Sequence, residues 1–351
     1  MPPTTQKALY LEKRFGSYVV GDIAMPKPGP GQVLIKVLAA GLNPVDWKIK
    51  EWGMFYEKES DFPAVLGSDL AGTVEGLGDG VTDFKVGDSV FTQAPHLKGF
   101  KGYQQHAVAF ASTLSKVPSN LSVDQAGTIA GSLTAPYVGL YREVPAGFGL
   151  HPPTSPKTQG IYTGTPIVIL GGATSVGQNV IQLAKLSGLS PIITTASLSN
   201  SEYLKSLGAT HVFDRNLPAD ALRAQVHSVS SGTPINYVYD CVSIESTQKA
   251  GLALLDEGGA IALVGPPVLV KSGEGKRVFQ VIGWLRKEDN LPLLEPFYHD
   301  YVRGFFEKGF LKPNAVEVLS NGLHGVPDGL ERLKNDQISR LKLVSRPQET
   351  V

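Results

Sequence analysis

The segment Ile167–Gly177 carries the strongest chemical signal in the chain. It contains VILGGATSVG, which follows an apolar run and opens a helical pattern. A glycine-rich turn between a buried strand and a helix lets backbone N–H groups and the positive helix end bind a pyrophosphate. The alternative is a glycine-rich turn that binds no ligand. We expect a dinucleotide site made by Gly172, Thr174, Ser175, Val176 and Gly177.

Thr174 is the one departure from the usual G-x-G-x-x-G spacing of such turns. When Gly172 and Gly177 are taken as the first and third glycines, Thr174 replaces the second. The middle glycine lets the backbone approach the pyrophosphate closely. The Thr174 side chain must therefore point away from the diphosphate or donate to it, while the N–H groups of 174–177 face the phosphates.

The next predicted strand indicates which nicotinamide cofactor the site prefers. A carboxylate after this strand binds a ribose 2′-hydroxyl and repels a 2′-phosphate. The stretch TTASLSN, 194–200, has no carboxylate. Ser197 and Asn200 offer neutral donors to phosphate oxygens, and Arg215 offers positive charge, so we expect NADPH. Ser199 or Asn200 also suits the N-cap of a helix at Ser201, and both interpretations can hold together.

These residues lie in a region where strands and helices alternate. Repeated strand–helix units with continuously apolar strands predict a parallel, doubly wound sheet. The predicted strands are 161–170, 192–196, 211–213, 235–239 and 260–264, and the predicted helices are 176–186, 202–207 and 247–255.

The first part of the chain has a different pattern. Short apolar runs separated by glycine turns predict a β-rich barrel or sandwich, and a helical pattern follows at 121–141 before a Pro/Gly-rich loop at 143–160. The tail returns to strand, helix and strand. We expect one domain from 1–135 with 309–351, and a second from 136–308. The predicted elements here are strands 7–11, 33–40, 65–75 and 86–91, the strand AVEVL, helix 327–334 and strand 340–344.

Composition excludes several classes of function. Lys plus Arg and Asp plus Glu each number 32, so no global field would hold nucleic acid or an anionic membrane. No apolar run is long enough to span a bilayer, and the first ten residues lack the apolar core of a secretory signal. The single cysteine, Cys241, forms neither a disulfide framework nor a four-cysteine zinc site. We expect a cytoplasmic protein without nucleic-acid or membrane partners.

Three segments in order carry a family resemblance. They are PKPGPGQVLIKVLAAGLNPVDWK, LGSDLAGTVEGLGDGVTDFKVGDSVF and VILGGATSVGQNVIQLAK. Over nearly its full length the chain resembles the medium-chain dehydrogenase/reductases, within them the quinone-reductase and enoyl-reductase branch, including fungal ene-reductases and trans-acting enoyl reductases. The resemblance implies an α/β fold with a GroES-like domain from both chain ends and an inserted Rossmann domain, with the active site in the cleft between them.

The chain departs from the zinc-dependent relatives at the ligand positions of the family. It has Gly41-Leu42-Asn43-Pro44 where an early cysteine ligand is expected, and Gly67-Ser68-Asp69 where Gly-His-Glu is expected. No pair of histidines has metal-like spacing. We therefore expect no metal, and reduction of a C=C bond conjugated to a carbonyl rather than alcohol oxidation.

The resemblance also implies roles for side chains in the first half. Asn43, with Pro44, is expected to touch the nicotinamide or its ribose, although an Asx turn is an alternative. Lys48 would donate to the substrate carbonyl or supply a proton, unless it is an ordinary surface lysine. Thr134 in SLTAP would lie near the nicotinamide carboxamide, or bond its own helix backbone.

Two further groups complete the candidate site. The ends of the fourth and fifth strands would meet the cofactor through their backbone, whereas an aromatic set would line the substrate pocket. Core packing is the alternative for both groups. The strand-end residues are Cys241, Val242, Leu263, Val264 and Gly265, and the aromatic residues are Trp52, Phe55, Tyr56, Phe279 and Trp284.

The leading hypothesis is an NADPH-dependent ene-reductase acting on small α,β-unsaturated ketones or aldehydes. The hydride would go to Cβ and the proton to Cα. Alternatives are a trans-acting enoyl reductase whose polyketide acyl thioester is tethered to a synthase carrier domain, and an NADPH:quinone reductase. A non-catalytic NADPH-binding protein is the hypothesis from a different class. A monomer is favoured over a dimer.

Overall fold

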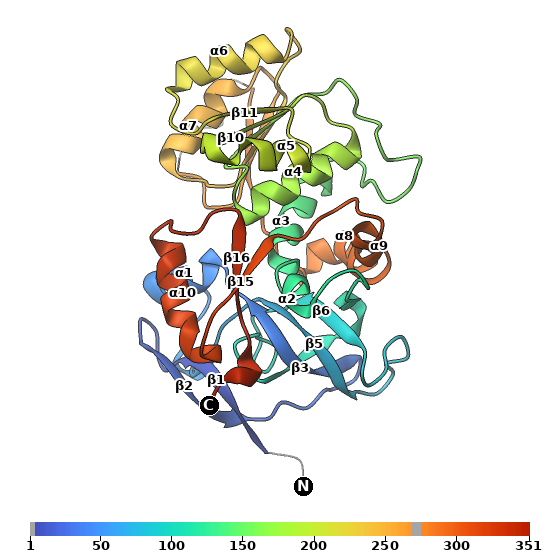
Figure 1. The fold of residues 1–351 in the computed structure, drawn as a ribbon, viewed down its shortest axis with the longest axis vertical. Coiled ribbons are helices and arrows are strands. Elements are labelled where there is room, and N and C mark those ends of the chain that lie inside the picture. The colour runs from blue at the N-terminus through green and yellow to red at the C-terminus, as the bar shows by residue number, and fades with distance from the viewer. Residues whose placement is uncertain (1–3, 269–274) are drawn as a thin grey trace. The chain divides into compact units, whose positions relative to one another are not determined.

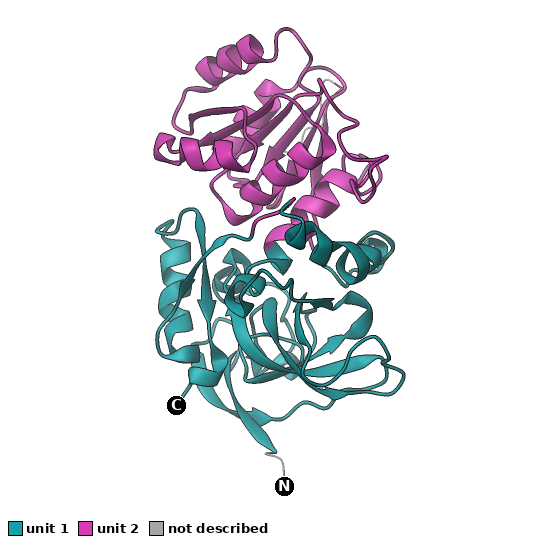
Figure 2. Cartoon of the chain, turned by 45° about the vertical axis from the view of Figure 1, so that its right-hand side comes forward, with its two compact units in different colours: residues 1–131, 284–309, 313–351 teal, residues 132–283, 310–312 magenta. Residues whose placement is uncertain are grey.

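The computed structural model describes residues 4–268 and 275–351. The chain forms two compact units, shown in different colours in Figure 2. Unit 1 comprises residues 1–131, 284–309 and 313–351, and unit 2 comprises residues 132–283 and 310–312.

Unit 2 is built on a six-stranded sheet in the order β11-β10-β9-β12-β13-β14, in which every pairing is parallel (Figure 1). This order reverses direction beside β9, as in doubly wound dinucleotide-binding folds. The predicted parallel sheet is confirmed. Its strands are β9 Ile167–Leu170, β10 Ile192–Ala196, β11 His211–Asp214, β12 Tyr237–Asp240, β13 Ala260–Leu263 and β14 Arg277–Gln280.

The sheet of unit 2 is buried on both faces. Every residue of β9 is buried, and Val168 and Leu170 pack into one cluster with Leu222 and Val226 of the helix α6. Among the helices of unit 2, α4 packs against α5, and α6 packs against α7. The helices are α3 Ala130–Tyr141, which starts in unit 1, α4 Ser175–Ser187, α5 Ser201–Leu207, α6 Ala219–Val229 and α7 Glu245–Leu254.

One predicted strand in this region is too long, and strand β14 was not predicted. The strand predicted at 161–170 begins only at Ile167, because residues 161–164 form a turn that ends at Gly164, whose φ of 82° is left-handed. Helix α6 was not predicted at all. The other predicted strands and helices of the alternating region are present, with ends that differ by one or two residues.

Unit 1 is β-rich. A three-stranded sheet has the order β2-β1-β4, and a seven-stranded sheet has the order β15-β16-β3-β5-β6-β8, with β7 also paired to β3. Strand β16 is antiparallel to β3, with Val344 opposite Gly41, so the C-terminal tail is part of this sheet. The strands are β1 Thr5–Leu11, β2 Tyr18–Ala24, β3 Gln32–Gly41, β4 Ala64–Val65, β5 Asp69–Leu77, β6 Ser89–Gln93, β7 His106–Phe110, β8 Ser115–Lys116, β15 Ala315–Val318 and β16 Leu341–Ser345.

Residues 284–309 belong to unit 1, whereas the predicted boundaries assign 284–308 to the second domain. This segment contains the helices α8 Leu291–Pro296 and α9 Val302–Glu307. The Asn120 amide donates to the Phe306 carbonyl at 3.0 Å, and the Leu285 N–H donates to the Gln93 side chain at 2.7 Å. These bonds and buried aromatic side chains hold the segment on unit 1.

The remaining helices of unit 1 are α1 Pro44–Trp52, α2 Val123–Ala126 and α10 Val326–Lys334. In the part of the chain that the structure describes, no helix combines the length and hydropathy needed to cross a bilayer.

Candidate active site

The glycine turn after β9 has the close packing that a dinucleotide cradle needs. A Cβ atom at Gly172 would lie 2.2 Å from Thr194 Oγ1, and one at Gly177 would lie 2.3 Å from the Gly171 carbonyl oxygen. Gly171 has a φ of 82°. Only glycine therefore fits this turn, which brings the start of α4 against the end of β9.

Thr174 is the N-cap of α4 and does not point at the expected phosphates. Its Oγ1 accepts the Gly177 N–H at 2.9 Å, and its own N–H donates to the Gly171 carbonyl at 3.0 Å. Of the four N–H groups expected to face a pyrophosphate, those of Thr174 and Gly177 are thus engaged within the turn. The N–H groups of Ser175 and Val176 have no acceptor among residues 4–268 and 275–351 and remain available at the helix end.

The residues expected to read the 2′-phosphate lie at the same edge of the sheet. Ser197 follows β10, and Arg215 follows β11, where the Arg215 N–H donates to the Ala196 carbonyl at 3.0 Å. Arg215 is exposed, and no acidic partner for it exists in the described part of the chain. Asn200 is buried and is the N-cap residue of α5, as one interpretation of the sequence has it, but its side chain forms no capping hydrogen bond. Ser197 and Arg215 are the better candidates.

Two of the strand-end residues have backbone N–H groups that are already hydrogen-bonded. The Val242 N–H donates to Asp240 Oδ1 at 3.0 Å, and the Val264 N–H donates to the Asp240 carbonyl at 3.2 Å. These donors are engaged within unit 2. The exposed Val242 side chain instead lies beside the glycine turn, 2.6 Å from where a Gly171 Cβ would be. Leu263 is fully buried, and Gly265 packs on Ser243.

Cys241 is a buried thiol beside the turn. Burial raises the pKa of Cys241 well above its ordinary value, and a hydrogen bond with Thr174 opposes this shift. The sulfur is therefore protonated at neutral pH. A protonated, buried thiol is inert, so its contribution is packing.

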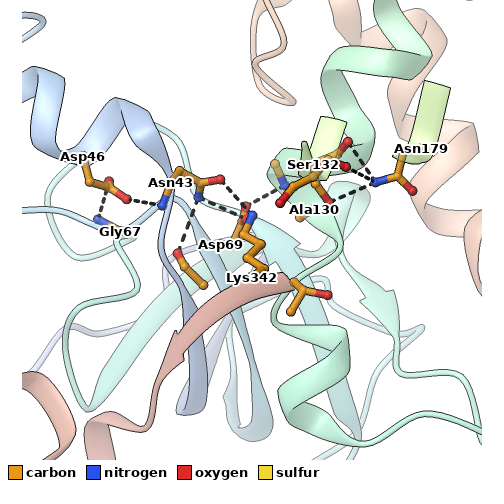
Figure 3. A network of polar contacts seen from close by, with 12 residues as sticks. Asn43, Asp46, Gly67, Asp69, Ala130, Ser132, Asn179 and Lys342 are labelled. Carbon is orange, nitrogen blue, oxygen red and sulfur yellow. Dashed lines mark hydrogen bonds and ion pairs between the residues drawn. The ribbon is translucent and has the colours of Figure 1, made fainter. Parts of the chain in front are cut away.

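In unit 1, Asn43 belongs to a polar network that reaches the last strand (Figure 3). Its Nδ2 donates to Asp69 Oδ2 at 3.1 Å, and its Oδ1 accepts from Lys342 Nζ at 2.8 Å. Lys342 also forms an ion pair with Asp69, and Asp69 Oδ1 accepts the Gly131 N–H at 2.6 Å. The Asn43 side chain thus forms no Asx turn. It links Lys342 and Asp69 at the start of α3.

Asp46 fixes the start of α1 from inside. It is fully buried, and its carboxylate accepts from the Asn43 N–H at 3.0 Å, the Tyr103 hydroxyl at 2.8 Å and the Gly67 N–H at 3.2 Å. Burial raises the pKa of Asp46, while these hydrogen bonds counteract the shift. Pro44 is the first residue of α1, where its missing N–H costs nothing.

Lys48 is not an ordinary surface lysine. Its Nζ lies 5.5 Å from the ring centre of Trp47 and 5.2 Å from that of Trp52. It has no acidic partner within the described residues, and burial lowers the pKa of its ammonium group. A partly desolvated, unpaired ammonium is a good donor for an oxygen that gains negative charge.

The structure brings three of the predicted pocket residues together around a histidine that the sequence did not indicate. The Phe55 ring is 5.1 Å from that of Trp284, and both rings contact His96, at 4.6 and 5.3 Å. Tyr56 lies 6.0 Å from His96.

The other predicted residues lie elsewhere. Trp52 contacts Trp47, at 5.5 Å between ring centres, and not the aromatic cluster. Phe279 is a buried residue of β14 in unit 2, packed 5.3 Å from Phe148, which is a core role. Thr134 is fully buried in α3.

Two hollows of the described molecule lie away from the aromatic residues and the glycine turn. One of about 540 Å³ is lined by Arg223, Asp256 and neighbouring residues of unit 2, and one of about 250 Å³ lies between α1 and α10. Among residues 4–268 and 275–351 no three His, Cys, Asp or Glu side chains are grouped as metal ligands.

Comparison with known proteins gives consistent matches. Residues 29–142 match the alcohol dehydrogenase GroES-like domain, and residues 175–286 match the family described as zinc-binding dehydrogenase. The chain is 36% identical over 347 residues to trans-enoyl reductase himH of Aspergillus japonicus, covering 97% of this chain and 96% of that protein.

Solved structures share the fold over the whole chain. Mycobacterial Rv1454c complexed with NADPH has a TM-score of 0.76 at 24% identity, with 97% of this chain and 100% of that chain covered. The quinone oxidoreductase from Coxiella burnetii has a TM-score of 0.74 at 25% identity, with 97% and 98% covered. The expected pairing of a GroES-like domain with a Rossmann-type sheet is thereby confirmed.

Proposed function

Because the chain belongs to the medium-chain dehydrogenase/reductase superfamily of oxidoreductases, we propose that it reduces the C=C bond of α,β-unsaturated carbonyl compounds with NADPH. The observation that carries this proposal is Lys48, a partly desolvated ammonium without an acidic partner in the described residues. Reduction of a conjugated C=C bond places negative charge on the carbonyl oxygen, and such a donor stabilises that charge.

The glycine turn fits the diphosphate of this cofactor. Its packing excludes any side chain at Gly172 and Gly177, and Ser175 and Val176 offer N–H groups at the positive end of α4. Ser197 and the unpaired Arg215 suit a 2′-phosphate, and the stretch 194–200 that ends β10 has no carboxylate to repel it. When bound, the reduced nicotinamide supplies the hydride.

Lys48 performs the protein's part of the reaction in this proposal. Its ammonium group donates a hydrogen bond to the substrate carbonyl oxygen, which draws electron density from Cβ and makes that carbon accept the hydride. The proton then reaches Cα from Lys48 directly or through water. The lowered pKa of Lys48 favours this transfer, because it makes the ammonium group a stronger acid that gives up its proton more readily.

A second candidate differs only in how the substrate arrives. The relative himH is named a trans-enoyl reductase, which favours an acyl thioester carried on a synthase domain as the alternative substrate. The similarity to a quinone oxidoreductase keeps simple quinones as a third class to test.

The test is NADPH oxidation followed at 340 nm with a vinyl ketone, a 2-alkenal, an enoyl thioester and a simple quinone, each repeated with NADH. Turnover of the ketone or alkenal with NADPH supports the proposal. Turnover of the thioester alone moves the assignment to the tethered substrate, and turnover of the quinone alone contradicts C=C reduction. NADPH binding without any turnover leaves the non-catalytic alternative.

A further inference from the structure

His96 lies inside an aromatic cluster of unit 1 that the proposed reaction does not yet use. We define this cluster as Phe55, Tyr56, His96 and Trp284. We propose that His96 is a substrate-binding residue that donates a hydrogen bond to a second oxygen of the substrate, one separate from the reacting carbonyl. This inference rests on the proposed function, and it names the substrate class as enones or enoyl chains that bear a further carbonyl group.

The His96 imidazole carries no charge at neutral pH. The ring is surrounded by Phe55, Tyr56 and Trp284, at 4.6 to 6.0 Å between ring centres. Burial, with a smaller effect of the nearby Lys101 ammonium, lowers the pKa of His96 to about 3. His96 is therefore neutral at physiological pH, with one ring nitrogen protonated and the other a bare acceptor.

The two ring nitrogens of His96 have different surroundings, which decide the tautomer. His96 Nδ1 is buried and has no hydrogen-bond partner in the described chain. Nε2 is not among the fully buried atoms, and no group of residues 4–268 or 275–351 bonds to it. A buried N–H without an acceptor is rarer and more costly than an unused lone pair. The proton consequently belongs on Nε2, which presents an N–H donor on the open side of the ring.

Two partly exposed aromatic rings stand beside this donor. Phe55 and Trp284 leave 36% and 40% of their surface exposed although both are large aromatic residues. Phe55 also has a φ of 68°, in the left-handed region that a bulky side chain rarely adopts. Such strain persists only where the surroundings enforce it, and it gathers at ligand sites. The exposed rings suit the flat, conjugated part of an enone.

His96 and Lys48 contact different residues of one short segment. The segment Trp52–Tyr56 has Trp52 in contact with the Lys48 ammonium and has Phe55 and Tyr56 in contact with His96. The two donors therefore flank opposite ends of this segment. A chain lying along it meets Lys48 with its reacting carbonyl and His96 with a second oxygen. The cluster offers no cationic imidazole, so a neutral carbonyl is a better match than a carboxylate.

The experiment compares two substrates in NADPH oxidation assays. One is a vinyl ketone with an alkyl chain, and the other is the same ketone with a second ketone on that chain. His96→Phe keeps a flat ring and removes the donor, His96→Gln keeps an N–H donor near the Nε2 position, and His151→Phe, at an exposed histidine outside the cluster, is the matched control.

For the diketone, we expect His96→Phe to lower kcat/KM about fivefold through KM, the scale of one hydrogen bond. His96→Gln should retain most of the activity, and the alkyl ketone and the control should change less than about twofold. Equal losses for both substrates, or no loss for the diketone, would overturn the inference.

A binding measurement keeps the test independent of turnover. The saturated diketone is titrated against wild type and His96→Phe, with tryptophan fluorescence as the signal. Tighter binding by wild type supports the role of His96 even if no enone is reduced, in which case only the proposed function fails. Equal binding by both proteins contradicts the inference. A His96 imidazole that titrates near pH 6.5 in ¹⁵N NMR spectra also contradicts it.

Discussion

The ion pair between Lys342 and Asp69 gives a sharp prediction of stability. Lys342 is 3% exposed and Asp69 is fully buried. In Lys342→Met the Asp69 carboxylate keeps the hydrogen bonds from Asn43 Nδ2 and the Gly131 N–H but loses its counter-charge. Removing one partner of a buried pair costs about 3–5 kcal/mol of the free energy of unfolding.

Two details of the site set where in that range the loss falls. The two remaining donors partly compensate the Asp69 charge, which favours the lower end. Asn43 Oδ1 also loses its bond from Lys342, which adds about 1 kcal/mol. We therefore expect a loss of about 4 kcal/mol. The double variant Asp69→Asn/Lys342→Met should be more stable than Lys342→Met by at least about 1 kcal/mol, because it leaves no buried charge without its partner.

The assay is guanidinium unfolding followed by tryptophan fluorescence. All three tryptophans of the chain, Trp47, Trp52 and Trp284, belong to unit 1, so their signal reports the unit that contains the ion pair. Lys85→Met, at an exposed lysine of the same unit, is the control and should be nearly neutral. A loss below about 1 kcal/mol in Lys342→Met, or a double variant less stable than the single one, would refute the reasoning.

Three further predictions concern activity, cofactor choice and pH. Lys48→Ala should lower kcat about 100-fold with NADPH affinity nearly unchanged, and unchanged kinetics would remove Lys48 from the mechanism. The kcat of the wild type should fall as pH rises through the lowered pKa of Lys48, because the ammonium group then loses its proton. Ser197→Asp should shift the NADPH/NADH ratio of kcat/KM roughly tenfold toward NADH by repelling the 2′-phosphate, and an unaltered ratio would mean that the phosphate is held elsewhere. Burial lowers the pKa of Lys101 to about 8 in the folded protein, whereas the pKa of a lysine in the unfolded chain is near 10.5. Between these two pH values the unfolded chain binds more protons than the folded one. The free energy of unfolding should therefore rise with pH over this interval, by about 3 kcal/mol in total. Lys101→Met should lack this rise in unfolding titrations, and parallel pH profiles of the two proteins would show that the charge is not buried.

The part of the site that is local in sequence could be predicted. The conformation of the turn from β9 into α4 is set by residues close in sequence. Atoms of the same turn and of the adjacent strand β10 leave no space for a side chain at Gly177 and Gly172. The side chain of Thr174 was the exception, because a threonine after a glycine turn can bind a ligand or cap the helix. Only its bond with the Gly177 N–H distinguishes the two roles.

The parts of the site that depend on tertiary pairing could not be predicted. Lys342 meets Asn43 and Asp69 across 299 and 273 positions of sequence, and a lysine in the pattern LKLVS gives no sign of burial. His96 has no regular element around it and gains its role only from rings that distant segments supply. Phe279 shows the opposite error, because an aromatic residue in a strand has the same pattern whether it faces a ligand or the core.

The interruption of unit 1 by unit 2 has a consequence for the order in which the protein is made. Nearly all of unit 2 is one continuous stretch, 132–283, whereas the sheet of unit 1 joins β3 to β16 near the end of the chain. On the ribosome, unit 2 can therefore fold as soon as its own residues have emerged, while β3 and Asp69 wait for β16 and Lys342. During that wait the end of β3 at Ala40 and Gly41 lacks the partner that β16 supplies, and this short edge is open to other chains. We expect nascent chains that end before residue 341 to be the stage at which this protein most needs a chaperone.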